Sequence, residues 1–191
     1  MTRQYNPKKK IISLLLMITV LLTGCGEEEE KLNSYRLEEI RGNQVVFAYS
    51  YGNWNGIPMR FVWIYNKYGQ CKKIDLMKNP EVKQNDEKQY LANLDACMVD
   101  DKIPFLESRL ELPDEKISYC INLAEIELSI INEGPIFDAP GKTFYVVSGV
   151  KEDRQLKVME DSDEYGDYVC ENEILQEACQ AIKSASEFPD R

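Results

Sequence analysis

The sequence predicts a single α+β domain in which antiparallel strands pack with about three helices, in the order βββ-αα-βββ-α. Two stretches, near 44–76 and 143–169, alternate apolar and other residues with a period of two, which is typical of strands. Other stretches repeat apolar residues at spacings of three and four, which is typical of amphipathic helices. Short connections rich in Gly, Asn and Pro separate the strands.

The first strand group is expected to form a three-stranded antiparallel meander. Its strands cover 45–51, 59–65 and a third segment that ends near Leu76, and the sequence from Asn66 to Gly69 indicates a tight turn. β-Branched and aromatic residues dominate these strands, as suits a pleated surface. Both faces of the first two strands are apolar, so we expect cover on both sides of this part of the sheet.

Two helices are expected after the meander. Asp86 is placed to cap the first of them, whose apolar face continues to Met98. After an irregular segment at 100–112, Pro113 is placed at the start of the second helix, since proline is tolerated in a first turn. The apolar stripe of this second helix consists of Ile117, Ile121, Ala124, Leu128 and Ile131.

The second strand group and the last helix complete the predicted domain. Strands are expected at 143–150 and 155–160, with a short third strand at 168–169. Asn172 is placed to cap the last helix, and Pro189 lies beyond its expected end.

Composition narrows the chemistry. Apolar residues make up 43% of the chain and charged residues 29%, which is typical of a folded domain. The chain has no histidine, which argues against Ser–His and Cys–His nucleophile pairs and against a histidine-based zinc site. Catalysis by carboxylates alone remains compatible with this composition. No cofactor is expected, and a role without catalysis is the favoured hypothesis.

The first residues have the pattern of an export signal. Arg3 and the run Lys8 to Lys10 precede an apolar stretch from Ile11 to Leu22. A helix of that length covers about 18 Å, which is short of the roughly 30 Å hydrocarbon core of a bilayer. A basic start followed by a short apolar stretch indicates a signal peptide rather than a membrane-spanning helix.

The end of this stretch carries the most specific motif of the chain. The residues Leu22-Thr23-Gly24-Cys25 resemble the lipobox of bacterial lipoproteins. The resemblance implies cleavage before Cys25 and a diacylglyceryl group on its sulfur, and hence export and anchoring to a bacterial membrane, expected at the outer face of the cytoplasmic membrane. The alternatives are a plain secretory leader with an unrelated cysteine and a buried N-terminal helix.

This interpretation divides the chain into a signal peptide at 1–24, a lipidated and acidic tether at 25–34, and a globular domain at 35–188. The signal peptide holds four basic residues and no acidic one, so the rest of the chain, out of 23 basic and 33 acidic residues, carries a net charge of −14. Such a field repels nucleic acid and anionic lipid surfaces. The membrane is therefore expected as a partner only through the N-terminal lipid.

Five cysteines follow Cys25, and their state is open at this stage. Export permits disulfides, and the pairs Cys97–Cys120 and Cys170–Cys179 are the first to test. The favoured alternative is that most of these cysteines are reduced and buried as small hydrophobic residues. No Cys-x-x-Cys spacing occurs, so the cysteines do not predict a metal site.

An acidic stretch at 160–167 offers a weak alternative for metal binding. Asp161, Asp163 and Asp167 partly match the start of a calcium loop. The match is poor because Tyr165 stands at a ligand position and Asn172 replaces the closing glutamate. A solvated acidic turn is the simpler interpretation, and no metal is expected.

Trp54 is the candidate binding residue. It lies among Asn and Gly residues on the connection between the first two strands. An exposed tryptophan can anchor a peptide, glycan or protein partner, although the same side chain can fold back as a lid on the sheet.

Together these features favour a non-catalytic surface lipoprotein with a binding, inhibitory or accessory role in the cell envelope. A protein or peptide of the envelope is the expected partner. The competing hypothesis is an envelope hydrolase that uses paired carboxylates, which requires a cleft with two convergent acids.

Overall fold

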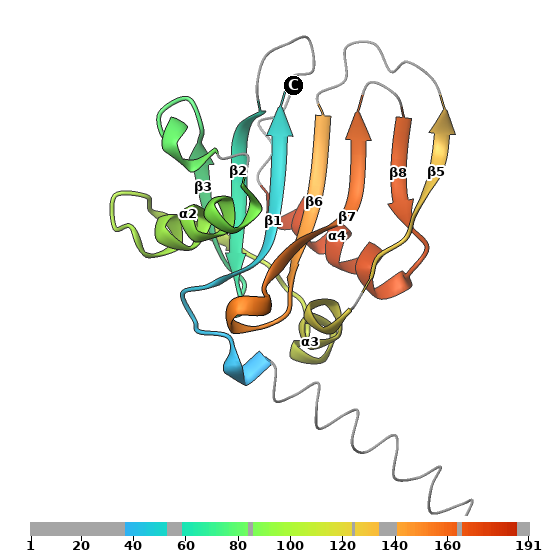
Figure 1. The fold of residues 1–191 in the computed structure, drawn as a ribbon, viewed down its shortest axis with the longest axis horizontal. Coiled ribbons are helices and arrows are strands. Elements are labelled where there is room, and N and C mark those ends of the chain that lie inside the picture. The colour runs from blue at the N-terminus through green and yellow to red at the C-terminus, as the bar shows by residue number, and fades with distance from the viewer. Residues whose placement is uncertain are drawn as a thin grey trace, which may run out of the picture.

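All eight strands in the described part of the chain pair into one antiparallel sheet, with the order β4-β3-β2-β1-β6-β7-β8-β5 (Figure 1). The structure is a computed structural model that describes residues 37–52, 59–83, 86–123, 125–133, 141–163 and 166–186. The strands are β1 (Val45–Gly52), β2 (Met59–Asn66), β3 (Gln70–Asp75), β4 (Phe105–Arg109), β5 (Leu128–Glu133), β6 (Gly141–Ser148), β7 (Gln155–Asp163) and β8 (Gly166–Cys170).

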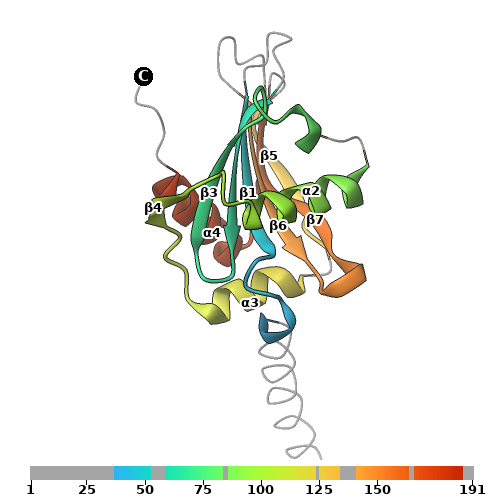
Figure 2. The same ribbon diagram turned by 90° about the vertical axis from the view of Figure 1, so that its left-hand side faces the viewer.

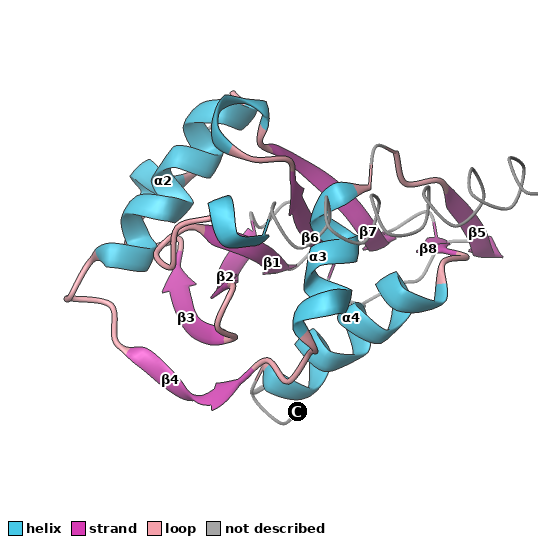
Figure 3. Ribbon diagram, turned by 90° about the horizontal axis from the view of Figure 1, so that it is seen from below, coloured by secondary structure: helices cyan, strands magenta, loops and turns pink. Residues whose placement is uncertain are grey.

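The sheet grows outward from a central antiparallel pair, β1 and β6. Strands β2, β3 and β4 follow β1 toward one edge, and β7 and β8 follow β6 toward the other, where β5 forms the last strand. Helix α3 (Asp114–Asn122) and the segment after it carry the chain from β4 to β5, at opposite ends of the sheet (Figure 3). The expected class, α+β with antiparallel strands, is confirmed.

Helices cover the two faces of the sheet unequally. Helix α2 (Glu87–Val99) lies on one face, and α3 and α4 (Glu173–Ala185) lie on the other (Figure 2). On the α2 side, no described helix lies over β8 and β5 (Figure 1).

The two 3-10 turns are η1 (Pro80–Val82) and η2 (Lys151–Asp153). In the described ranges, no helix combines the length and apolar character needed to cross a bilayer.

A separate apolar core fills each side of the sheet. The core under α3 and α4 contains the largest buried side chains, among them Trp63, Tyr49 and Phe144. The rings of Tyr49 and Phe144 stack with their centroids 4.3 Å apart. The core under α2 is aliphatic and includes Ile64 and Leu94. Strand β1 is buried almost throughout because it lies mid-sheet between these cores, which confirms the cover predicted on both of its faces.

The two helix caps that the sequence predicts are confirmed. The Asp86 carboxylate accepts a hydrogen bond from the Gln89 amide at 2.8 Å and so caps α2. The Asn172 side chain accepts from the amides of Ile174 and Leu175 and caps α4.

The tight turn between β2 and β3 is also confirmed. The Gly69 amide donates to the Asn66 carbonyl at 3.0 Å, and Gly69 has a φ of 71°. A Cβ at this position would lie 2.3 Å from the Leu110 carbonyl oxygen, so the turn needs a residue without a side chain.

The predicted order of elements is wrong between residues 100 and 133. The segment expected to be irregular contains β4, and the helix expected to reach Ile131 ends at Asn122. Leu128 and Ile131 belong to β5, which pairs with β8, so hydrogen bonding within the sheet prevails over the helical spacing of these two residues. A short helical stretch at 37–39 also precedes β1.

A buried ion pair fastens α2 to the middle of the sheet. The Arg154 guanidinium donates to the Asp95 carboxylate at 2.5 and 3.3 Å and to the Val45 carbonyl at 2.5 Å. The Asp95 carboxylate also accepts from the Val45 amide at 2.8 Å. Because these bonds join α2, β1 and the turn before β7, they fix the helix over its core.

Candidate interaction surface

The two residues that the sequence singled out most directly, Cys25 and Trp54, lie outside the described residues. Of the aromatic residues near Trp54 in the sequence, Tyr49 and Trp63 are wholly buried and Tyr51 is half-buried. The lipid anchor and the Trp54 contact therefore stay predictions.

The acidic stretch does not converge on one site. The Asp161 carboxylate accepts a hydrogen bond from the Thr143 hydroxyl at 2.7 Å, and the Asp167 carboxylate accepts from the Ser162 hydroxyl at 2.6 Å. Asp161 and Ser162 are neighbours in β7 and so point to opposite faces, which places the carboxylates of Asp161 and Asp167 on opposite sides of the sheet. The side chain of Asp163 lies outside the described residues. Among the described side chains, no group of three or more His, Cys, Asp or Glu could hold a metal ion.

The cysteines of the described chain are buried, and no disulfide joins them. The suggested Cys97–Cys120 pair is incompatible with the fold, because Cys97 belongs to the core under α2 and Cys120 to the core on the other face. Cys170 and Cys179 share one core with Cys120. Burial raises the pKa of Cys120 to about 12 and also raises the pKa values of Cys170 and Cys179. These thiols are therefore poor nucleophiles at neutral pH.

One surface cavity lies between α2 and the η2 turn and has a volume of about 440 Å³. Its lining includes Asp95 and Glu152, but the Asp95 carboxylate is bound to Arg154. Paired-carboxylate catalysis needs two acids that converge across a cleft on a substrate. This cavity does not offer that arrangement.

Three of the four large apolar side chains that are exposed on the described strands lie on the edge strand β5, and the fourth is Phe105 on β4. Leu128, Ile130 and Ile131 are 36%, 52% and 64% exposed. Strand β5 pairs with β8 on its inner side, and no described strand pairs with it on its outer side. An apolar edge strand is a template on which another chain can pair.

Charged side chains protect strand β4, at the opposite edge of the sheet, from pairing with other chains. Strand β4 also carries an exposed aromatic residue, Phe105, but Glu107 and Arg109 follow it and are both exposed. Charged side chains of this kind discourage pairing with other chains. From Leu128 to Asn132, β5 has no charged residue, and its charged residue, Glu133, stands at its end. A backbone irregularity between Ile130 and Asn132 also interrupts the edge.

A second cavity, with a volume of about 370 Å³, opens at the start of β5. Strand β8 ends at Cys170, opposite Leu128, and pairs with β7 only from Glu160 onward. Beyond the end of β8, β7 therefore faces the segment before β5 with no strand between them. The cavity is lined by Glu125, Ile126, Glu127, Leu128, Lys157 and Val158.

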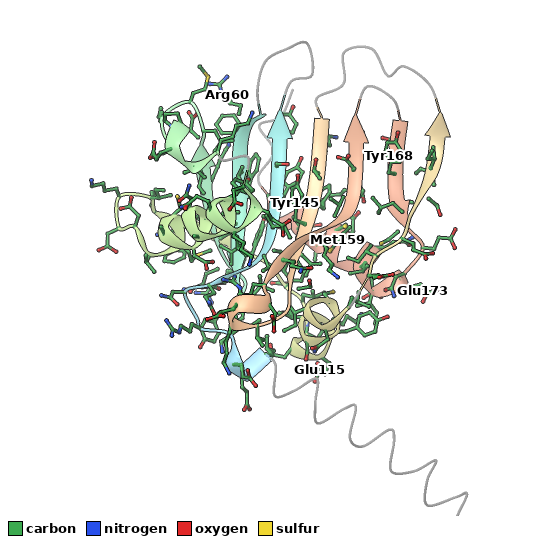
Figure 4. All side chains as sticks on the ribbon, viewed as in Figure 1. Arg60, Glu115, Tyr145, Met159, Tyr168 and Glu173 are labelled. Carbon is green, nitrogen blue, oxygen red and sulfur yellow. The ribbon has the colours of Figure 1, made fainter. Side chains whose placement is uncertain are left out.

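The surroundings of β5 are acidic. Glu125 and Glu127 are exposed at the cavity, and the exposed Glu171 accepts a hydrogen bond from the Ser129 hydroxyl at 3.1 Å. Glu173 lies at the start of α4 near the same edge (Figure 4). One basic residue, Lys157, also lines the cavity, and its ammonium donates to the Leu123 carbonyl at 3.4 Å. The strand therefore presents apolar side chains within a negative field.

The sequence prediction missed this surface. The segment from Glu125 to Ile130 alternates charged or polar residues with apolar ones, which is the signal of a strand. The helical spacing of Leu128 and Ile131 competes with this signal, because it continues an apolar stripe that is helical as far as Ile121.

Comparison with known proteins gave no match. No protein-family model, no curated protein and no solved structure is similar enough to this chain to support an assignment. The role of the β5 surface must therefore be inferred from its own residues.

Proposed function

We propose that this protein is an exported, lipid-anchored binding module of the bacterial envelope, with no catalytic activity of its own. Its N-terminal Cys25, after cleavage, carries the lipid and holds the domain at the outer face of the cytoplasmic membrane. The folded part recruits or blocks another protein there. The observation that carries the binding role is the edge strand β5, where no charged residue interrupts the exposed Leu128, Ile130 and Ile131, whereas Glu107 and Arg109 follow the exposed Phe105 in β4.

Several further features support binding rather than catalysis. Both cores are filled with buried side chains, and the described groups with raised pKa values are tyrosines and cysteines held in those cores. Glu125 and Glu127 share the cavity at β5 but are both exposed. Acid–base work by two carboxylates depends on different environments for the two groups, which exposed neighbours do not provide.

Photocrosslinking in the bacterium that makes the protein tests this proposal. A photoreactive phenylalanine analogue replaces one exposed apolar residue at a time, at Tyr68, Met77, Val99 or Ile131. A binding module anchored in the membrane gives a discrete adduct with another envelope protein from at least one position. The adduct is expected to weaken in the Cys25→Ser protein, because that protein cannot be lipidated and its domain is no longer held at the membrane by the lipid. Absence of an adduct at all four positions contradicts the proposal.

A further inference from the structure

We infer that the β5 edge binds an extended segment of a partner protein, which adds to the sheet as a further strand and carries alternating apolar and basic residues. This inference rests on the proposed binding role and specifies where the partner binds and what its chemistry is. The added strand pairs with the outer side of β5, and its lysine or arginine side chains meet the acidic cavity at the start of that strand.

The backbone of β5 supplies the affinity in this arrangement. An edge strand has amide and carbonyl groups that are not used by its sheet, and an incoming strand pairs with them irrespective of its sequence. Ile130 and Ile131 are more than half exposed, so they offer apolar contacts to the side chains of the added strand. The α2 face of the sheet leaves room for these side chains, because no described helix covers β8 or β5 there (Figure 1).

The cavity at the start of β5 supplies the specificity. Ile126, Leu128 and Val158 give it apolar walls, and the exposed Glu125 and Glu127 outnumber the basic residue of its lining, Lys157, whose ammonium donates to the Leu123 carbonyl. A lysine or arginine side chain matches this combination, because its aliphatic stem packs against apolar surface while its charged end stays at the rim. A volume of about 370 Å³ is ample for such a side chain.

Charge selects a basic partner over a second copy of this chain. Pairing of two β5 strands would bring two copies of the acidic surface around Glu125 and Glu127 close together. Like charges brought together across a strand pair are destabilising. The net charge of −14 that the chain carries without residues 1–24 adds a general repulsion between copies and a general attraction for a cationic segment.

The test uses the lipid-bearing protein, purified from membranes in detergent, and synthetic peptides that alternate valine with lysine, or valine with glutamate. Hydrogen–deuterium exchange of the β5 amides and fluorescence anisotropy of labelled peptides report binding. The valine–lysine peptide is expected to slow exchange at 128–132 and to bind more weakly as salt is added. The same peptide with a central proline, which lacks an amide donor, is expected to bind at least about tenfold more weakly.

Two pairs of variants locate the site. Ile131→Lys places a protective charge on the edge and is expected to weaken binding of the valine–lysine peptide about tenfold or more. The control is Met77→Lys, at a residue that is 70% exposed and lies just after β3. Charge reversal by Glu125→Lys/Glu127→Lys is expected to favour the valine–glutamate peptide. The matched reversal Glu107→Lys/Glu111→Lys, at the β4 side of the sheet, is expected to change neither affinity.

The outcomes separate this inference from the proposed function. Absence of peptide protection at β5, equal binding of both peptides, or equal effects of Ile131→Lys and Met77→Lys overturns the edge-strand inference. Concentration-dependent dimers that Ile131→Lys abolishes overturn it too, since the occupant is then a second copy. Photocrosslinked adducts at positions away from Ile131 would still support a binding module in each of these cases.

Discussion

The buried ion pair between Arg154 and Asp95 gives the most exacting test of the fold. The Arg154→Met variant keeps most of the aliphatic stem and removes three hydrogen bonds, two to Asp95 and one to the Val45 carbonyl. Loss of one partner from a buried pair costs about 3–5 kcal/mol. The Asp95 side chain is 24% exposed, so water compensates part of the loss and a cost of about 3 kcal/mol is expected.

The Asp95→Ala variant is expected to lower the free energy of unfolding by at least as much. It leaves the Arg154 side chain, which is only 6% exposed, without its charged partner. Urea unfolding followed by the fluorescence of the buried Trp63 measures both losses. A slope of about 1–3 kcal/mol per molar urea turns 3 kcal/mol into a midpoint shift of about 1–3 M.

The double variant and a surface control complete this experiment. The combined loss in Asp95→Ala/Arg154→Met is expected to fall below the sum of the single losses by about 1–3 kcal/mol, because neither charge is left unpaired. Lys151→Met removes the exposed pair between Lys151 and Glu39 and is expected to cost less than about 1 kcal/mol. Additive single losses, or single losses no larger than that of Lys151→Met, would refute the assignment of the Arg154 pair as a link between α2 and the sheet.

Three more measurements follow from the fold. Gly69→Ala is expected to lower stability by about 1–3 kcal/mol, because a left-handed residue meets the Leu110 carbonyl, whereas Gly141→Ala, whose Cβ meets nothing closer than 3.5 Å, should cost less. Lys72→Met removes an ammonium that donates to the Asp100 carbonyl at 2.7 Å and is expected to cost about 1.5–3 kcal/mol, with faster hydrogen exchange at the end of α2. Burial raises the pKa of the Cys120 thiol to about 12, whereas a thiol in the unfolded chain has a pKa of about 8.5. The contribution of this thiol to the free energy of unfolding is therefore fully present below the unfolded pKa and is lost as the pH rises toward 12. Cys120→Ala should reduce this loss of stability with pH, and an unchanged dependence on pH would contradict the prediction.

The elements that the sequence predicted correctly are those with local signals. Asp86 and Asn172 cap their helices with their own side chains, and the turn at Gly69 requires a left-handed residue. Strand β1 was predicted as covered on both faces because its apolar residues occupy both faces of the pleat. Each of these features depends on residues that are close together in the sequence.

The elements that the sequence did not predict depend on distant partners. Strand β4 follows Pro104 and pairs with β3, and β5, whose local alternation competes with a helical spacing, pairs with β8. The union of both strand groups into one sheet depends on the pairing of β1 with β6, which are far apart in the sequence. The candidate interaction surface was missed for the same reason, since β5 becomes an edge only once the strand order is known.

The mass of the mature protein tests the account of where this domain works most directly. Protein extracted from the membranes of its own host is expected to begin at Cys25, with residues 1–24 removed and a diacylglyceryl group on the Cys25 sulfur. The Cys25→Ser protein should show neither change. A wild-type protein that keeps its first 24 residues, or that lacks the lipid, would contradict the anchored binding module proposed for this chain.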